Sequence, residues 1–468
     1  MKNLIRHILI ISFIAVFPLK ADNEALIQEN LRNLNSSDAA VRHRAIIVLS
    51  KFNNDPRAMP AMINALRDTS PKVREAALVS IQSMPMTQNA LNDVVNCIDD
   101  PSVSVRRICS SMLRNYFPDG SPNTLFLTRE VKQKISKAFT DKDDVVRRNL
   151  IARYSAFSSL LPDSTLSKLL KDKNREVRIL ALVAASRSSY GRQFLSKVRH
   201  LAKDEDRLIR LKLVKTMQAR MYLDEKMIAT LMEDKDSEIS TYAELMQLSL
   251  KPDSKRWKSL YSKVNSADTK SELAIVIVKE LIKSFKADKG ELTKLLKHNK
   301  SAIRKAALQN MLIYKRSLIK NSDYIDFLSD SNSEIRKTAM RQVDLSKIPL
   351  EKIEAFAESP YSDIRNLVLV ICNTQQVKGE SELIMGLFLD DNTEVRSTAL
   401  KLIYIKKLED WQQILEDSLE DDEMAVKKMA VQLSAQNKGT QKALYKYLKD
   451  GDDEELKLFI RQYLGSSF

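Results

Sequence analysis

The chain has 468 residues, a net charge of +15 from 76 Lys or Arg against 61 Asp or Glu, and only 8 Gly. Because Gly supplies the positive φ angles of phosphate-binding loops, tight hairpins and β-bulges, the chain can build few of them. The composition therefore argues against a dinucleotide-binding domain, a P-loop enzyme and a turn-rich β-sandwich. It favours an all-helical chain.

Residues 1–21 have the composition of a secretory signal peptide. Lys2 and Arg6 precede the apolar stretch 8–19, and Ala21 provides a small residue before Asp22. The apolar stretch is shorter than the roughly 20 residues of a membrane anchor, and no other segment approaches that length. We therefore expect export, to the periplasm in a Gram-negative cell and otherwise to the medium, and a mature chain of net charge +12.

A pair formed by an apolar residue, the anchor, and a following Arg recurs along the chain. Most intervals are 29 to 32 residues, with one of 41 and one gap of 94. Ile239-Ser240 and Leu273-Ala274 fit the gap as weakened copies, and Val426-Lys427 and Leu456-Lys457 extend the series to about fourteen units of roughly 31 residues. The Arg residues of the pair are Arg42, Arg74, Arg106, Arg147, Arg178, Arg210, Arg304, Arg336, Arg365 and Arg396.

Each unit has the pattern of a helical hairpin. A polar turn such as Asp99-Asp100-Pro101 precedes the anchor, and apolar residues follow it with helical spacing, as in Val177, Ala181 and Ala184. A second helical stretch, such as 166–171, precedes the turn. One hairpin cannot bury its apolar face, so neighbouring units are expected to stack as an α-solenoid over residues 22–468.

The stretch Asn64-Ala-Leu-Arg-Asp-Thr-Ser-Pro-Lys-Val-Arg-Glu-Ala-Ala-Leu78 resembles the HEAT repeat family, in its shorter HEAT-like form of the PBS-lyase type, and residues 387–400 repeat it. The resemblance implies a right-handed superhelix whose second helices line the concave surface. It also implies that the ten Arg residues form a structural ladder with the turn Asp residues. Ser240 and Ala274 lack the Arg, so the ladder should break near 239–275. The 41-residue interval indicates an insertion near 117–128, either a contact loop or a tolerated surface insertion.

The charge is concentrated in the middle of the chain: residues 126–341 carry +19 and residues 342–468 carry −7. Positions two, six and nine after an anchor lie opposite the apolar stripe, and there the second helices carry Arg107, Arg114, Arg148, Lys215, Lys305, Lys337 and Arg341. These candidate partner contacts could recruit an acidic protein, an anionic glycan or lipid head groups. The alternative is a solvated face, since Ile179 and Leu211 interrupt the stripe.

Nucleic acid is not an expected partner. The segment Lys255-Arg256-Trp257-Lys258 alternates aromatic and basic residues, but Trp257, Leu260, Tyr261 and Val264 have the spacing of a packed helix stripe. They are therefore predicted to be core residues.

No catalytic, metal or cofactor site is predicted. The mature chain has His43, His200 and His298 without a His-Glu-x-x-His pair, and lacks Gly-x-Ser-x-Gly and Cys-x-x-Cys motifs. Cys97 and Cys109 could form a bridge in an exported hairpin or remain buried thiols, which leaves Cys372 unpaired. The expected function is an exported, non-catalytic binding or scaffolding solenoid with an acidic partner; the alternative is a lyase or transferase that uses the groove.

Overall fold

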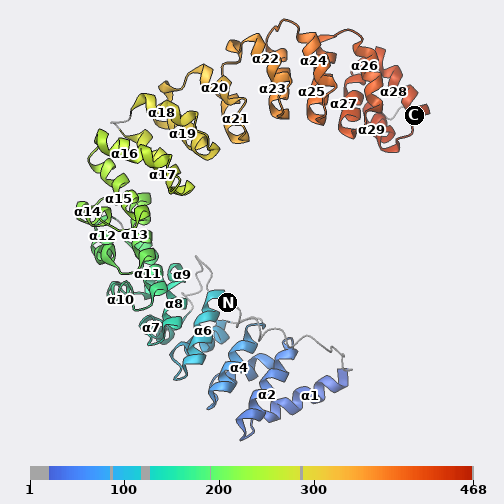
Figure 1. Ribbon diagram of the computed structural model, residues 1–468. Helices are drawn as coiled ribbons and strands as arrows, with labels where there is room; N and C mark the ends of the chain where they lie inside the picture. Colours follow the sequence, from blue (N-terminus) through green and yellow to red (C-terminus); the bar gives the residue numbers. More distant parts are fainter. Residues whose placement is uncertain (1–19, 85–87, 117–126, 190, 285–287, 466–468) are drawn as a thin grey trace. The chain divides into compact units, whose positions relative to one another are not determined.

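The structure, a computed structural model, describes residues 20–84, 88–116, 127–189, 191–284 and 288–465 (Figure 1). These ranges are helical and contain no strand. The chain divides into two compact units, residues 1–250 and 251–468, called unit 1 and unit 2 below. This boundary falls inside the range 239–275, where the repeats lack Arg.

Seven hairpins make up the described part of unit 1. Their first helices are α1 (Lys20–Asn33), α3 (Ala58–Ala65), α5 (Gln88–Asn96), α7 (Arg129–Ala138), α10 (Asp163–Leu169), α12 (Gly191–Val198) and α14 (Glu225–Met232). Their second helices are α2 (Ala39–Leu49), α4 (Pro71–Ile81), α6 (Val103–Tyr116), α8 (Asp144–Ile151), α11 (Arg175–Ser188), α13 (Arg207–Arg220) and α15 (Ser237–Leu250), and the short helix α9 (Tyr154–Phe157) follows α8.

Unit 2 has seven further hairpins in its described part. The first helices are α16 (Ser254–Val264), α18 (Lys289–Leu296), α20 (Asn321–Phe327), α22 (Leu350–Ala357), α24 (Glu380–Phe388), α26 (Trp411–Asp417) and α28 (Lys438–Asp450). The second helices are α17 (Ser271–Lys283), α19 (Ser301–Tyr314), α21 (Ser333–Met340), α23 (Ser362–Thr374), α25 (Thr393–Lys406), α27 (Met424–Ser434) and α29 (Glu454–Leu464). Short 3-10 segments are η1 (Ser50–Phe52), η2 (Cys97–Asp99), η4 (Ser158–Leu160), η5 (Arg199–Lys203), η6 (Arg316–Leu318), η7 (Leu345–Lys347) and η8 (Ser418–Glu420).

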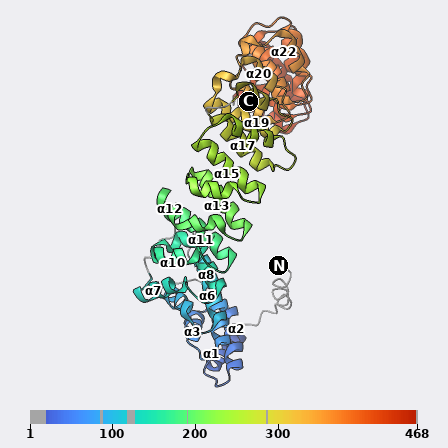
Figure 2. The same ribbon diagram turned by 60° about the vertical axis from the view of Figure 1, so that its left-hand side comes forward.

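Within each unit the second helices form one layer and the first helices the other. Figure 2 shows α11, α13 and α15 side by side in unit 1, and Figure 1 shows the same arrangement for α23, α25 and α27 in unit 2. The all-α solenoid of stacked hairpins that the repeat predicts is confirmed in each unit. Its core consists of the anchors and the residues one helical turn later, such as Val177 and Ala181, which are fully buried.

The polar turns start the second helices as predicted. In α11, Asn174 Oδ1 accepts hydrogen bonds from the backbone N–H groups of Glu176 and Val177. Asn332 and Asn392 do the same at the starts of α21 and α25. A side-chain oxygen at this position satisfies N–H groups that have no partner within the helix, which fixes where these three helices begin. Helices α4, α17, α19, α23 and α27 begin without such a side-chain hydrogen bond.

The Arg that follows each anchor ties three chain segments together. Arg74 Nε and Nη2 donate to both carboxylate oxygens of Asp100 in the next turn, at 2.8 and 2.7 Å, and its Nη1 donates to the Asp68 carbonyl at 2.7 Å. Asp100 also accepts the N–H of Ser102. The other pairs of this ladder are Arg42–Asp68, Arg106–Asp141, Arg147–Asp172, Arg178–Asp204, Arg210–Asp234, Arg304–Asp330, Arg336–Asp363, Arg365–Asp390 and Arg396–Asp421.

The ladder changes where the sequence departs from the repeat. The Ser240 hydroxyl donates to the Ser237 carbonyl instead of reaching the next turn. His298 occupies the turn position held elsewhere by Asp: its Nδ1 accepts the N–H of Lys300 and its Nε2 lies 2.9 Å from Asn265 Oδ1. Burial lowers the pKa of His298, which favours the neutral ring that this hydrogen bond requires.

The structure also bears on the predictions for the cysteines, for Trp257 and for the N-terminal and inserted segments. Cys97, Cys109 and Cys372 are free, buried thiols, so the bridge between Cys97 and Cys109 is absent. Trp257 is buried and its indole N–H donates to the Leu281 carbonyl, which confirms the core assignment. The signal peptide lies outside the described residues except for the first residues of α1, and so does the insertion near 117–128 except for Leu127 and Thr128.

Candidate binding surface

The outward stripe of a second helix consists of the positions two, six and ten after the anchor, which share one helix face. Three consecutive second helices of unit 2 carry a continuous basic surface at these positions. The basic face, as it is called below, comprises Ile275, Lys279 and Lys283 of α17, Lys305, Gln309 and Ile313 of α19, and Lys337 and Arg341 at α21. All eight residues are at least partly exposed and none is acidic, so the face presents positive charge without a carboxylate on its own stripe.

The candidate contacts in unit 1 are engaged within the chain. Arg107 donates to Asp143 at 2.6 Å, Arg148 to Glu176 at 2.7 Å, and the Lys215 ammonium lies 2.9 Å from Glu238. Each carboxylate belongs to the next hairpin. The hydrogen bonds from Arg107 lower the pKa of Asp143, which is the effect of a cation that stabilises the ionised acid. These three cations therefore hold neighbouring second helices together.

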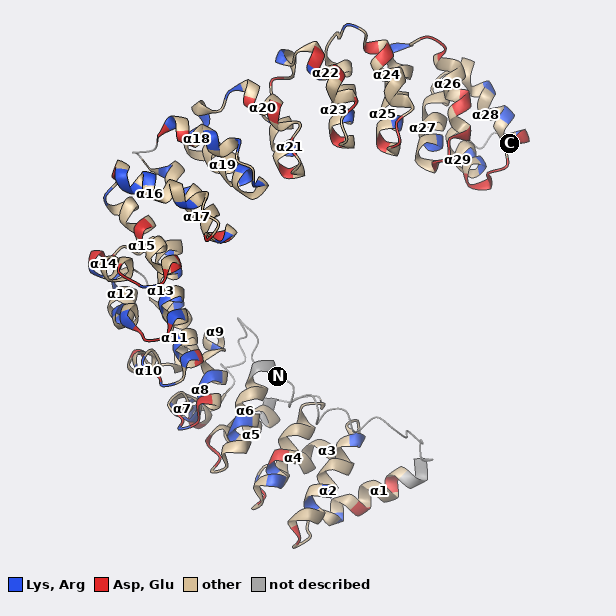
Figure 3. Ribbon diagram, in the orientation of Figure 1, with Lys and Arg blue, Asp and Glu red and all other residues tan. Residues whose placement is uncertain are grey.

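The candidates in unit 2 are less engaged. Among the described residues, Lys305 and Arg341 form no ion pair, and Lys337 pairs only with Glu334 of its own helix, at 3.2 Å. The side chain of Arg114 in unit 1 lies outside the described residues. The structure thus separates the sequence-predicted contacts into a paired set in unit 1 and a largely free set in unit 2. Figure 3 marks where Lys and Arg lie along the helices of each unit.

The residue just before the anchor accounts for the ion pairs of Arg148 and Lys215 and for the lack of one at Lys279. Glu176 and Glu238 hold that position in α11 and α15, and they receive Arg148 and Lys215 of the preceding second helix. In α19 the position belongs to Ala302, and Lys279 of the preceding α17 forms no ion pair within the described ranges. Lys279 was not among the sequence candidates because its anchor, Leu273, is a weakened copy; counting six residues from that anchor would have found it.

An apolar spot adjoins the free cations. Ile313 is 71% exposed and Tyr314 is 45% exposed at the end of α19. The Lys283 ammonium of α17 lies 5.6 Å from the centre of the Tyr314 ring, so the ends of α17 and α19 meet there. The sequence pattern did not include Ile313, because it counted positions two, six and nine after the anchor and Ile313 is at position ten.

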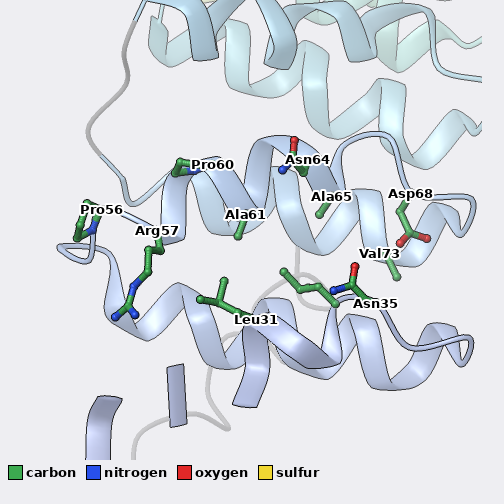
Figure 4. A pocket seen from close by; sticks show the side chains of 11 residues that line it. Leu31, Asn35, Pro56, Arg57, Pro60, Ala61, Asn64, Ala65, Asp68 and Val73 are labelled. Atoms are coloured by element: carbon green, nitrogen blue, oxygen red, sulfur yellow. The ribbon is translucent and has the colours of Figure 1, made fainter. Parts of the chain in front are cut away.

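Three pockets of the described chain lie between successive first helices. One of about 630 Å³ lies between α1 and α3, where Leu31 and Ala61 face each other (Figure 4). Its charged groups are already paired: Arg57 donates to Glu24 and Asp55 and lowers the pKa of each carboxyl to about 2.

Two similar pockets occur in unit 2. One of about 420 Å³ between α18 and α20 includes His298, and one of about 280 Å³ lies between α26 and α28. In the first, Asp330 pairs with Arg304 and Asp326 with Lys297. Within the part of the chain that the structure describes, no cluster of three His, Cys, Asp or Glu side chains could hold a metal ion. None of the helices in the described ranges has the length and apolar composition needed to cross a bilayer.

Comparisons with known proteins agree with this architecture. Residues 27–113 match the family model of HEAT repeats. Among curated protein sequences, no significant match was found. The X-ray structure of YibA from Escherichia coli is 19% identical, with a TM-score of 0.33, over 64% of this chain and 99% of YibA. Kap95p, in a structure concerned with its binding to RanGDP, is 11% identical, with a TM-score of 0.49, over 95% and 72% of the two chains.

Because both structural similarities are low, the assignment depends on the family match and on the repeat itself. The helical hairpin matched at residues 27–113 recurs through both units, with an Arg–Asp pair between successive turns from Arg42–Asp68 to Arg396–Asp421. Residues 27–113 therefore resemble HEAT repeats, and the described part of each unit has an α-solenoid fold.

Proposed function

We propose that the chain is a non-catalytic binding or scaffolding protein that holds an acidic partner protein against the second helices of unit 2. The observation that supports this most directly is the basic face, where Lys279, Lys305 and Arg341 have no ion-pair partner among the described residues. Lys283 and Lys337 of the face pair with Glu280 and Glu334 of their own helices. Clustered positive charge attracts an acidic surface and raises its association rate. By contrast, Arg107 and Arg148 already have carboxylate partners.

The absence of an assembled catalytic group in the described chain supports a non-catalytic role. Two histidines have structural contacts: His200 Nε2 lies 3.1 Å from the Leu170 carbonyl, and His298 replaces a turn Asp. The buried thiols are not activated, because burial raises the pKa of Cys97 to about 12 and that of Cys372 to about 11. A thiolate nucleophile needs the opposite shift.

Site-specific photocrosslinking tests the location of the partner. A photoreactive amino acid replaces Gln309, in the centre of the basic face, in the full chain expressed in its source cells. The matched control carries it at Ser259, an exposed residue of the first helix α16 in the same unit. We expect a discrete adduct at Gln309 only, whose captured protein, identified by mass spectrometry, is acidic. Equal capture at both sites, or adducts only with glycan or lipid, would contradict the proposal.

Export is the second part of the proposal, and it is supported by the residue pattern of the first 21 positions. N-terminal sequencing of the protein recovered from envelope and medium fractions tests it. We expect a chain that starts near Asp22. A cytoplasmic protein that retains Met1 would contradict the assignment.

A further inference from the structure

The basic face contains an apolar spot as well as charge. Single exposed apolar residues are common on protein surfaces, but Ile313 and Tyr314 are adjacent and are exposed by 71% and 45%. They lie on the helix that carries Lys305, and Lys283 contacts the Tyr314 ring from α17. A partner that brought only negative charge would leave both apolar side chains in water.

The helix geometry sets the spacing between the charged and apolar parts. Lys305 and Ile313 are two turns apart on one face of α19, which places their Cα atoms about 12 Å apart at 1.5 Å per residue. An extended chain covers that distance in about four residues. Neighbouring second helices are about 10 Å apart, or about three extended residues. Carboxylates spaced in this way could reach Lys279, Lys305 and Arg341.

We propose that the basic face binds a short extended segment of the partner protein that has several acidic residues and, about four residues from them, one large apolar side chain that packs on Ile313 and Tyr314. This inference depends on the proposed function, because it names the part of the acidic partner that is recognised. The carboxylates pair with Lys279, Lys305 and Arg341, and the apolar side chain supplies selectivity. A sulfated glycan or a lipid head group offers no matching apolar side chain.

Two fluorescent synthetic peptides test the proposal with the purified mature chain. Both have acidic residues at one end; one has leucine about four residues beyond them and the other has serine there. Fluorescence anisotropy gives the dissociation constants. We expect the leucine peptide to bind about tenfold more tightly, because burial of a large apolar side chain is favourable by that order. Raised salt should weaken both peptides.

Substitutions test whether the preference for the leucine peptide comes from the apolar spot at Ile313 and Tyr314. Ile313→Ser should remove the preference for leucine and leave the binding of the serine peptide unchanged. Ile405→Ser is the matched control, because Ile405 is 51% exposed at the same stripe position of α25, outside the basic face. It should leave the preference intact. Lys305→Glu together with Arg341→Glu should weaken both peptides at least tenfold.

The inference and the proposed function can fail separately. Equal binding of the two peptides by the natural chain, or a leucine preference that survives Ile313→Ser, overturns the apolar contact. Failure to bind either peptide also overturns the inference. Crosslinking from Gln309 decides the proposed function independently, since it detects any acidic protein on the basic face whatever segment is recognised.

Discussion

The outward cations named in unit 1 and those of the basic face in unit 2 are used in different ways. In unit 1, Arg107, Arg148 and Lys215 each contact a carboxylate of the next hairpin at 2.6 to 2.9 Å. In unit 2, Lys305 and Arg341 have no such partner within the described residues. The positive charge of residues 126–341 is therefore not one continuous binding surface. The named cations of unit 1 that pair contact the next hairpin, whereas Lys279, Lys305 and Arg341 of the basic face form no ion pair within the described residues.

The difference shows that a cation at a given repeat position has no fixed role. Glu176 and Glu238, each just before an anchor, receive Arg148 and Lys215, whereas Ala302 offers Lys279 no carboxylate. The residue before the anchor does not decide the role alone, because Glu334 precedes Ile335 but pairs with Lys337 of its own helix and leaves Lys305 without an ion pair in the described chain. The ladder Arg residues have the same partner type in both units, so the contrast concerns the outward stripe alone.

The largest effect is expected for the buried ladder, which both units share. Arg210 and Asp234 form a bidentate pair whose side chains are only 9% and 5% exposed. Asp234→Ala leaves a buried guanidinium without its partner and should lower the free energy of unfolding by about 3 to 5 kcal/mol. Urea denaturation measures it. Asp268→Ala is the control, because Asp268 has the same turn position, is exposed and forms no ion pair among the described residues; its cost should stay below about 0.5 kcal/mol. Equal costs would show that the ladder is not what stabilises the turns.

The ion pairs of the unit 1 cations should make the free energy of unfolding depend on pH in the acidic range. Hydrogen bonds from Arg107 lower the pKa of Asp143 below its ordinary 3.8. The folded state then favours the ionised carboxylate, so the stabilisation is fully present above the ordinary pKa and is lost as pH falls through the lower, folded pKa. Asn can also cap a helix, so Asp143→Asn removes mainly the charge. It should cost about 1 kcal/mol at pH 7, and this cost should disappear as the pH falls through the lower, folded pKa of Asp143. A cost that is independent of pH would mean that charge pairing is not its origin.

The smallest expected effect is a difference in stability between two variants, each of which lacks one exposed cation, one in each unit. Arg148→Ala breaks a partly exposed pair with Glu176 and should cost about 0.2 to 1 kcal/mol. Lys305→Ala removes a cation that has no ion-pair partner in the described chain and should leave stability unchanged within error. Thermal unfolding in low and high salt measures both, and salt should reduce only the first cost. A larger loss of stability in Lys305→Ala than in Arg148→Ala would mean that Lys305 also forms a stabilising ion pair.

The repeat frame could be predicted from the sequence because its signals are local. Each anchor, turn Asp or Asn and following Arg lie within a few residues of one another, as in Asp172, Asn174, Val177 and Arg178, and they occupy the expected places. The hairpins, the buried anchors and the Trp257 core position follow from such patterns.

The division of the outward cations could not be predicted in the same way. Arg107 pairs with Asp143 across the single 41-residue interval. Lys215 pairs with Glu238, which precedes the weakened anchor Ile239. In both places the irregular repeat hides which residue of the next hairpin faces the cation. Net charge counts every Lys and Arg equally, and only the side-chain contacts separate Arg148, which is paired, from Lys305, which is not.

The central claim is that the free cations of unit 2 hold the partner, and the yield of the crosslinked adduct at Gln309 tests it most directly. Lys305→Glu with Arg341→Glu is compared with Lys255→Glu and Lys258→Glu, which make the same change in net charge on exposed residues of the first helix α16. The account predicts at least a tenfold lower yield for the first variant, an unchanged yield for the second, and equal unfolding temperatures. Equal loss in both variants, or no loss in the first, would contradict it.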